Sequence, residues 1–578
     1  MRITYNDKLN KLLNPYLESL LKEKSSLEPE TLTLFDLFME DLDMGGRYGI
    51  FSEILEPRLE EIIREENIES IANLMDGRLN TLFRYMLGDE FAGLFHTYLQ
   101  LEARCPHTIG YDRRAQRSAH PSNHLDHARD AWLQFLKLRA TGFSVEAILK
   151  GGNTPEDTEE FSGYMNSSYW LAAQIAQGNE KVIEYLNQVL TSENNVHRLQ
   201  RWYLHAIAIS GHRPLLELEG KLLLAAKLQE GLRQAIVETM DEGCPESYLY
   251  LFSIIYNNGL QRFASVKRSI AVCTGIGEQD SSERITNKYV ELIWNFLNHP
   301  ETARNTLQSK DTVELYLALW SIGFYDTDEI RAIVPDIIRK GAKHQIQTLL
   351  YFLRCTQSSQ MNHLISKDAF EVWHDDPKVV AAILPLYMDG LYLSRYSDNK
   401  EAPTLSDYFE TPEEAVRHYG YLKQVYQSIS AKEVYSPYVF PWDCVVLTRS
   451  DVVLKMAYIA WMTNDIRLRE ELCTYLPALE SYNRASYIGI VLPRTESKVE
   501  QEYVLQSLGD RSADIRDEAY KVLSEMSLSP EQYQHIEELL RFKYSEMRIN
   551  AINLLMKQPE AQLAASIRRL LSDKNAEH

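Results

Sequence analysis

Two related stretches near the end of the chain decide the fold. Residues 507–523 read SLGDRSADIRDEAYKVL, and residues 539–555 read LLRFKYSEMRINAINLL. The residues that recur 32 positions apart are Ile515-Arg516 with Met547-Arg548, and Ala519 with Ala551. A fixed period of this kind is typical of stacked helical units, because each unit buries its apolar face only against its neighbours. The sequence therefore predicts a helical-repeat array.

The repeat resembles the HEAT pattern, in which a short turn with an aspartate precedes a helix with an apolar-arginine pair and a small alanine. Asp510 stands in the turn of the first copy, whereas Phe542 replaces it in the second. In this pattern the alanine allows close helix packing and the arginine is placed to bond the turn of a neighbouring unit. The resemblance implies an all-α fold, an irregular α-solenoid of HEAT-like helix pairs.

A third copy starts at Leu570-Leu571-Ser572-Asp573 and stops at His578, before its first helix. A solenoid normally ends in a capping helix with a polar outer face. We therefore expect the repeats to be truncated, the chain to be the N-terminal part of a longer polypeptide, and His578 to begin a purification tag. The alternative is a natural terminus at this point.

Proline placement marks where helices begin. Seven of the 20 prolines stand in an X-Pro-Glu tripeptide. Proline suits the first helical position, and glutamate beside it lies at the positive end of the helix dipole. The seven prolines are Pro29, Pro155, Pro245, Pro300, Pro412, Pro530 and Pro559. The capping boxes expected among them pair Thr154 with Asp157, Thr411 with Glu414 and Ser529 with Gln532.

The composition is that of an ordinary globular protein. The 578 residues are 45% hydrophobic, and 61 basic against 82 acidic side chains leave a net charge of −21. This balance makes nucleic acid an unfavourable partner for the chain as a whole. We find no signal peptide, and Lys455 interrupts the most apolar run, residues 452–462, so we expect no membrane span. Six cysteines without a CxxC pair are typical of a reducing compartment and predict a cytoplasmic location.

The helical region with Leu539-Leu540-Arg541-Phe542-Lys543, Met547-Arg548 and Leu570-Leu571-Ser572-Asp573 resembles the large bacterial MolR-like proteins. The resemblance covers roughly the last 75 residues and brings no catalytic motif. Such proteins are long helical-repeat proteins thought to work beside MoxR-type AAA+ ATPases and von Willebrand A-domain proteins. The resemblance implies that this chain is a scaffold or adaptor in such a system.

We predict five segments along the chain. They are an N-terminal helical region with an acidic face (1–103), a basic histidine-containing loop (104–129), a helical-repeat array (130–385), a Tyr/Pro-rich insertion (386–444) and C-terminal HEAT-like repeats (445–578). Residues 28–69 carry 13 acidic and three basic side chains, nearly half of the net charge. The acidic face is a docking surface for a basic partner or a solvated helix face.

The 104–129 loop combines arginines with possible zinc ligands. Neutral imidazole and thiolate are preferred by zinc, and the candidates are Cys105, His107, His120, His124 and His127. Their spacing matches no standard zinc finger, and the neighbouring arginines would repel a cation. The other two interpretations are a basic loop that contacts a partner or phosphate through Arg113, Arg114 and Arg117, and an ordinary polar loop.

The 386–444 segment is rich in tyrosine, with nine tyrosines and four prolines at positions 403, 412, 437 and 441. Tyrosine offers a large contact area with a polar tip, so Tyr435, Tyr438 and Trp442 are candidate partner-binding residues. The alternative is a packed loop that braces two helical blocks.

The sequence contains no phosphate-binding loop, zinc-protease helix, nucleophile elbow or dinucleotide motif. We therefore predict no catalytic and no cofactor-binding residue. The predicted function is a non-enzymatic scaffold that binds other proteins. The alternatives are a zinc-dependent enzyme or zinc-stabilised module centred on residues 105–127, and a nucleic-acid-binding helical scaffold.

Overall fold

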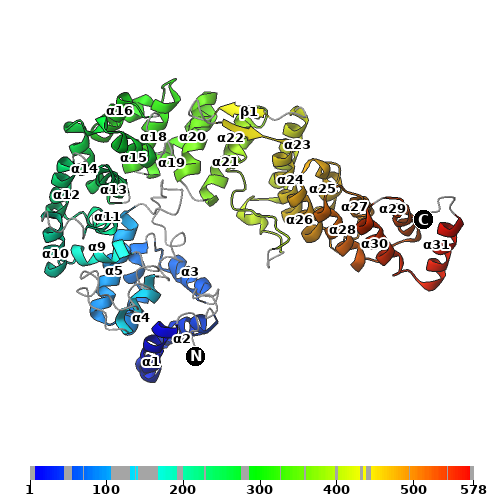
Figure 1. Ribbon diagram of the computed structural model, residues 1–578, viewed down its shortest axis with the longest axis horizontal. Coiled ribbons are helices and arrows are strands. Elements are labelled where there is room, and N and C mark those ends of the chain that lie inside the picture. The colour runs from blue at the N-terminus through cyan, green and yellow to red at the C-terminus, as the bar shows by residue number, and fades with distance from the viewer. Residues whose placement is uncertain are drawn as a thin grey trace. The chain divides into compact units, whose positions relative to one another are not determined.

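The computed structural model describes most of the chain as α-helices joined by short turns (Figure 1). The described residues are 7–44, 55–68, 71–105, 131–136, 138–140, 167–191, 199–226, 229–241, 243–274, 285–325, 327–356, 359–396, 401–429, 434–437, 444–493, 495–542 and 544–572. Packing contacts divide the chain into two units. Unit 1 is residues 1–333 with 355–358, and unit 2 is residues 334–354 with 359–578.

The helices of unit 1 are α1 (Asp7–Glu23), η1 (Lys24–Ser26), α2 (Pro29–Met44), α3 (Glu56–Glu65), η3 (Ile71–Met75), α4 (Leu79–Leu87), α5 (Asp89–Arg104), α9 (Ser167–Ala176), α10 (Glu180–Thr191), α11 (Arg201–Ser210), α12 (Arg213–Ala225), α13 (Glu230–Asp241), α14 (Pro245–Asn257), η5 (Leu260–Arg262), α15 (Ala264–Thr274), α16 (Asn287–Asn298), α17 (Pro300–Thr306) and α18 (Thr312–Tyr325). Helix α19 (Thr327–Lys340) contains the boundary between the units.

Unit 2 continues with α20 (Lys343–Thr356), α21 (Ser359–Trp373), α22 (Pro377–Ile383), η7 (Leu405–Asp407), α23 (Pro412–Ser428), β1 (Val434–Pro437), β2 (Cys444–Leu447), α24 (Arg449–Thr463), α25 (Ile466–Leu472), η8 (Leu476–Ala478), α26 (Ser481–Val491), α27 (Lys498–Ser507), α28 (Ala513–Glu525), α29 (Pro530–Leu539), α30 (Ser545–Leu555) and α31 (Glu560–Ser572). The described part of the chain is therefore all-α apart from one short hairpin, as the sequence predicts in outline. No described helix has the length and apolarity needed to span a membrane.

Each described proline of the X-Pro-Glu tripeptides lies at the first residue of a helix or directly before it. Helices α2, α14, α17, α23 and α29 each begin at the proline of an X-Pro-Glu tripeptide, and α31 begins one residue after Pro559. The Ser529–Gln532 capping box is complete, because Ser529 accepts from the Gln532 N–H and the Gln532 side chain accepts from the Ser529 N–H. The Thr154 signal lies outside the described residues.

The Thr411–Glu414 pair forms only half of the expected capping box. Thr411 Oγ1 accepts from the Glu414 N–H at 3.1 Å. The Glu414 carboxylate accepts instead from the Glu410 N–H and pairs with Lys367. The glutamate is therefore drawn towards a buried lysine of another helix rather than towards its own cap.

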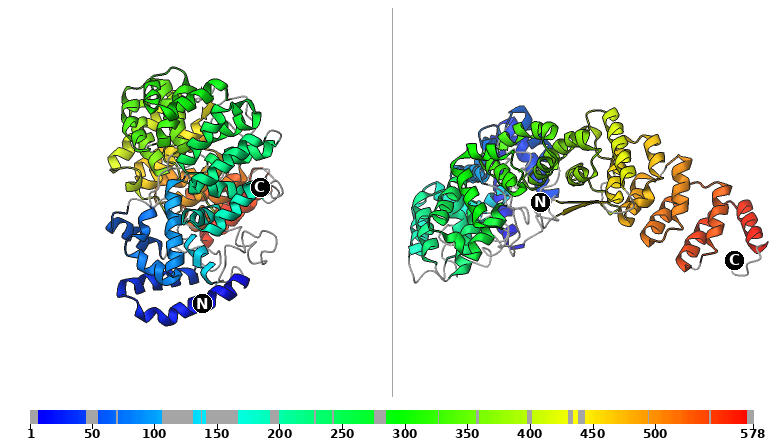
Figure 2. Two further views of the ribbon diagram at one scale, coloured as in Figure 1. Left: turned by 90° about the vertical axis from the view of Figure 1, so that its left-hand side faces the viewer. Right: turned by 90° about the horizontal axis from the view of Figure 1, so that it is seen from above.

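Alternate helices stack on one another in both units. In unit 1, α9, α11, α13 and α15 form one layer, and α10, α12, α14, α16 and α18 form another (Figure 1). In unit 2, α24, α26, α28 and α30 form one layer, and α25, α27, α29 and α31 form the other. The second array is the row of orange to red helix pairs in Figure 2. Buried apolar side chains fill each step, for example Ile515 and Ala519 on α28 and Met547 and Ala551 on α30.

The repeated arginine of α28 links two neighbouring elements. The Arg516 guanidinium donates to the backbone carbonyls of Asp510 and Arg511, both at 3.0 Å, in the turn before its own helix. It also pairs with Glu546 of α30 at 2.9 Å. Arg516 therefore bonds the turn of its own copy rather than the turn of a neighbouring unit, and it reaches the neighbouring copy through Glu546.

Several glutamates near the N-terminus are engaged by basic side chains of unit 1. The Arg78 guanidinium binds Glu30 and Glu65 at 2.6 Å and also contacts Glu66. This hydrogen bonding from Arg78 lowers the pKa of the Glu65 carboxyl. These carboxylates of the 28–69 segment are therefore partly neutralised within the unit itself.

The predicted 386–444 insertion contains a helix and the first strand of a hairpin, whose second strand begins at Cys444. Helix α23 lies within it, and β1 pairs antiparallel with β2, with Val434 opposite Leu447 and Pro437 opposite Cys444. The expectation of an all-α fold missed this hairpin, which contains three valines in its two strands.

The front of the insertion, residues 391–396, crosses α26 and α28. The hydroxyls of Tyr392 and Tyr482 lie 3.0 Å apart, and the Arg395 N–H donates to Ser486 Oγ at 3.3 Å. The Arg395 guanidinium pairs with Asp514 at 2.5 Å. We call residues 391–396 the strap. These contacts tie α26 to α28 within one array, and the interpretation of the 386–444 segment as a brace between two helical blocks stays a prediction.

We expect Ser529→Ala to lower the free energy of unfolding by about 1 kcal/mol, because it removes the hydrogen bond that Ser529 Oγ accepts from the Gln532 N–H. Urea denaturation of the full chain, followed by circular dichroism, measures the effect. Ser527→Ala is the matched control, since Ser527 is exposed two residues before the cap. Equal losses of stability in the two variants would contradict the assigned role of the cap.

Candidate functional site

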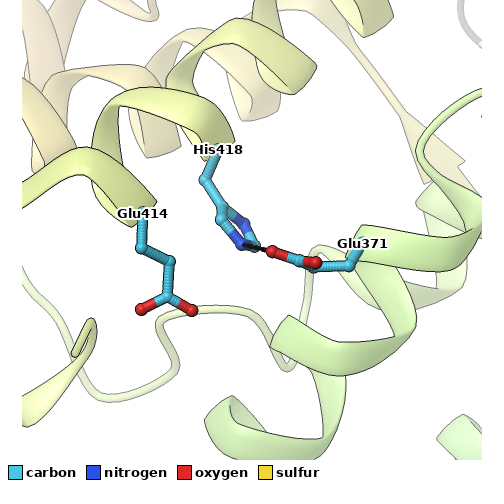
Figure 3. A group of neighbouring side chains, drawn as sticks. All are labelled: Glu371, Glu414 and His418. Atoms are coloured by element: carbon cyan, nitrogen blue, oxygen red, sulfur yellow. Dashed lines mark hydrogen bonds and ion pairs between the residues drawn. The ribbon is translucent and has the colours of Figure 1, made fainter. Parts of the chain in front are cut away.

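A group of titratable side chains, several of them buried, lies between α21 and α23 in unit 2. His363, Lys367 and Glu371 follow one another at intervals of four residues and therefore share a face of α21. Glu414 and His418 have the same spacing on α23. We call the following residues the polar cluster: His363, Lys367, Glu371, Tyr387, Glu414, Arg417 and His418. Figure 3 shows Glu371 and His418 pointing towards each other from facing helices, with Glu414 one turn away.

The cluster is tied together by close polar contacts. His418 Nε2 lies 3.2 Å from Glu371 Oε1, and Tyr387 Oη lies 2.9 Å from His418 Nδ1. The Arg417 guanidinium pairs with Glu371 at 2.6 Å, and Lys367 Nζ pairs with Glu414 at 3.0 Å. His418 and Tyr387 are 0% exposed. The cluster thus joins α21, α23 and the turn after α22 through two fully buried rings, while the Arg417–Glu371 pair at its edge is partly exposed.

The hydrogen-bond partners define the protonation of His418. Burial lowers the pKa of His418 to about 4, so its imidazole is neutral at pH 7. A carboxylate only accepts hydrogen bonds, so Nε2 carries the proton and donates to Glu371. Nδ1 then accepts from the hydroxyl of Tyr387, whose pKa burial holds well above its ordinary value.

His363 is held in the same way by backbone groups. Its Nδ1 accepts the Met388 N–H at 2.9 Å, so Nε2 carries the proton and donates to the Tyr408 carbonyl at 2.8 Å. Burial lowers the pKa of His363 to about 4. Met388 has a φ of 51°, a left-handed conformation that is uncommon for a residue with a side chain. His363 thus stabilises the turn in which Met388 adopts this uncommon backbone conformation.

Three members of the cluster are of the types that bind metal. One ligand atom each from Glu371, Glu414 and His418 lies within 4.8 Å of the others. However, Arg417 and Lys367 already balance the two carboxylates, and the proton of His418 occupies the nitrogen that would face a cation. Burial raises the pKa values of Glu371 and Glu414, but their basic partners outweigh it and leave both pKa values below the ordinary value. The described contacts therefore suit an internal brace better than a cation site.

A different kind of surface lies on the last helix pair. A groove of about 510 Å³ is formed between α30 and α31 and is lined mainly by apolar side chains. Ile549, Ile552 and Met556 on α30 are 56%, 49% and 64% exposed, and Ile567 on α31 is 46% exposed. Arg548 also lines the groove, which has no acidic residue in its wall. We call this surface the end groove.

The structure describes only some of the residues predicted from the sequence as sites. Cys105, at the end of α5, is buried with its Sγ 3.8 Å from the Ile209 carbonyl. Tyr435 lies in β1, where its backbone is opposite Val446. The other candidates lie outside the described residues: His107, His120, His124, His127, Arg113, Arg114, Arg117, Tyr438 and Trp442. The zinc and nucleic-acid interpretations of this loop stay predictions.

Both surfaces identified in the structure escaped the sequence analysis. The four-residue spacing of His363, Lys367 and Glu371 is visible in the sequence, but charged residues at this spacing usually mark a solvated face. The sequence also contained a pattern that indicates the end groove. Ile549, Ile552 and Met556 are spaced at a helical period and lie next to the predicted core positions Met547 and Ala551. Whether such a stripe is covered depends on the next helix, which the pattern of one helix does not reveal.

We expect the stability of unit 2 to fall as the pH drops from about 6.5 towards 4, because the unfolded chain takes up protons on histidine before the folded chain does. His418 and His363 have folded-state pKa values of about 4, so their stabilisation is complete above pH ~6.5 and is lost towards pH 4. Each contributes a slope of at most ~1.4 kcal/mol per pH unit. His418→Phe should flatten the profile by one such contribution, as measured by urea denaturation at several pH values.

His535→Gln is the control for this experiment, because the His535 side chain is 38% exposed at the surface. It should leave the pH profile unchanged. A His418→Phe profile as steep as that of the wild type would contradict the assignment of a buried, neutral imidazole.

Comparison with known proteins supports a single assignment. No curated protein and no solved structure gives a significant match to the chain. A family model does match, and it covers residues 34–578, which include the polar cluster, the strap and the end groove. The chain therefore belongs to the family of unknown function DUF5724.

Proposed function

We propose that this chain is a non-enzymatic protein-binding scaffold that works in the cytoplasm. Its helices form an irregular α-solenoid of HEAT-like pairs, and partners bind to surfaces that the stacked helices present. The stacking of alternate helices in both units supports this interpretation, because such arrays bury a continuous core and offer extended binding faces.

The end groove is the observation that carries the proposal. Exposed apolar patches with a polar border are typical of protein–protein interaction sites. Ile552, Met556 and Ile567 are each close to half exposed or more, whereas Ile515 of α28 is fully buried by its neighbours. An apolar face of this kind gains free energy when a protein covers it.

The polar cluster supports a scaffold rather than an enzyme. Its imidazoles and its tyrosine are buried and hydrogen-bonded to one another, so a substrate has no access to them. The resemblance to MolR-like proteins suggests the class of partner. A MoxR-type AAA+ ATPase and a von Willebrand A-domain protein are the first candidates.

We expect Ile552→Asp with Met556→Asp to remove specific partners from the chain. The tagged full chain and the double variant are expressed in native cells, cross-linked and compared by quantitative mass spectrometry. Partners of the groove should decrease at least tenfold in the variant, since a charge in an apolar contact opposes binding.

Val499→Asp is the matched control, because Val499 is a 46% exposed apolar residue of α27 outside the groove. It should retain the partners, and circular dichroism should show all variants folded. The proposal fails if the double variant captures the same proteins in the same amounts as the wild type.

A further inference from the structure

Unit 1 contains a group of basic side chains in a part of the chain that has no acidic residue. Residues 247–277 include no aspartate or glutamate, although the whole chain has 82. Helix α15 begins within this run and packs against α13 (Figure 1). We call the following residues of α13, η5 and α15 the basic patch: Arg233, Arg262, Phe263, Lys267 and Arg268.

Two guanidinium groups of the basic patch lie on one aromatic ring. The guanidinium carbons of Arg233 and Arg262 are 4.1 and 4.7 Å from the centre of the Phe263 ring. Main-chain carbonyls hold both groups, because Arg233 Nη1 donates to the Ala226 carbonyl and Arg262 Nη1 donates to two carbonyls just after α14, both at 3.0 Å. The fold therefore fixes two like charges beside each other.

No described carboxylate forms an ion pair with the basic side chains of the patch. By contrast, Arg78, Arg201 and Arg304 of the same unit each pair with a glutamate. Arg233 is only 6% exposed, and its Nε has no acceptor among the described residues. Glu230, one turn earlier on α13, is exposed and makes no ion pair with it. Since a nearly buried cation without a counter-charge is unfavourable, the patch calls for an anion.

The start of α15 adds further positive charge at this place. Helix α15 begins at Ala264, which is exposed and directly follows Phe263. The N–H groups of a first turn have no partner within the helix and lie at its positive end. Side chains of a helix lean towards its N-terminus, so those of Lys267 and Arg268 lean towards this first turn. Arg268 is half-buried, and its Nε also lacks an acceptor among the described residues.

We propose that the basic patch binds a phosphoryl group. A phosphate monoester carries a charge of about −1.5 to −2 at pH 7 and offers three acceptor oxygens. Several cations and a helix N-terminus match this charge better than they match one carboxylate. Guanidinium groups also bind phosphate oxygens through two parallel hydrogen bonds. The phosphoryl group belongs either to a phosphorylated side chain of a partner protein or to a free phosphate ester.

A nucleic acid suits the patch less well than a single phosphoryl group. Nucleic acids present a row of phosphates and are bound by a basic stripe or face. The cations of the patch are confined to one position on α13, to η5 and to the second turn of α15. The patch lies on other helices than the end groove, so this inference adds a second binding site and does not depend on the groove.

Peptide capture by the immobilised full chain tests the proposal with defined probes. The probes are a random peptide library with a central phosphoserine, matched libraries with serine or aspartate at that position, and a short single-stranded DNA. Inorganic phosphate and free phosphoserine serve as competitors. Retained molecules are quantified for the wild type and for Arg262→Glu, in which an exposed side chain is changed.

Arg213→Glu is the matched control for this experiment. Arg213 is also an exposed arginine over an aromatic ring, with its guanidinium carbon 3.8 Å from the centre of the Tyr250 ring. It differs from Arg262 in pairing with a carboxylate, that of Glu217, at 3.1 Å. Circular dichroism checks that both variants are folded.

The wild type and Arg213→Glu should retain the phosphoserine library at least ~10-fold better than the serine and aspartate libraries, and Arg262→Glu should lose this preference. Retained peptides that share a sequence preference and resist competition identify a phosphorylated protein as the ligand. Retention regardless of sequence, with full displacement by inorganic phosphate or free phosphoserine, identifies a free phosphate ester. Both results support the phosphoryl site.

Four results would overturn this inference. They are an absence of preference for phosphoserine over serine, equal retention of the aspartate library, a preference that persists in Arg262→Glu, and retention of the DNA in place of the peptides. The second result makes an acidic segment the ligand, and the fourth makes a nucleic acid the ligand. None of them decides the proposed function of the end groove, which is tested by the variants of α30.

Discussion

Stacking of each helix on the second helix after it is the constraint on which this structure depends. A helix in such a layer has two faces to cover, one turned to the preceding step and one to the following step. Inside the array both faces are buried, as Ile515 and Ala519 of α28 illustrate. On α30 the side chains of Ile549, Ile552 and Met556 are about half exposed or more, and with Ile567 of α31 they line the end groove.

Ion pairs between helices also stabilise the stacked arrangement. The net charge of −21 suggests a strongly acidic surface, yet many carboxylates bind cations of their own unit. Arg78 pairs with glutamates of both α2 and α3. Arg516 donates a hydrogen bond to the turn before α28 and pairs with Glu546 of α30. Such pairs contribute little free energy where they are exposed, but nearly buried ones define register, because an unmatched buried charge is strongly unfavourable.

Local features of the fold could be read from the sequence, whereas contacts between distant segments could not. Prolines 245, 412 and 530 begin helices as predicted, because a first turn is defined by neighbouring residues. The β1–β2 hairpin was missed, since its strands are only four residues long. The polar cluster was missed because Glu371 meets His418 across 47 residues, and no pattern within one helix shows which face another helix covers. The exposed apolar side chains of α30 were missed for the same reason.

The strap connects successive steps of the C-terminal array. Tyr392 and Arg395 reach across 90 and 119 residues to α26 and α28, and so cross-tie two steps of the stack. The strap also accepts a hydrogen bond from Tyr458 of α24 through the Leu391 carbonyl. Unfolding of any of these helices therefore breaks contacts of the strap as well, so the strap makes the unfolding of the successive steps more cooperative.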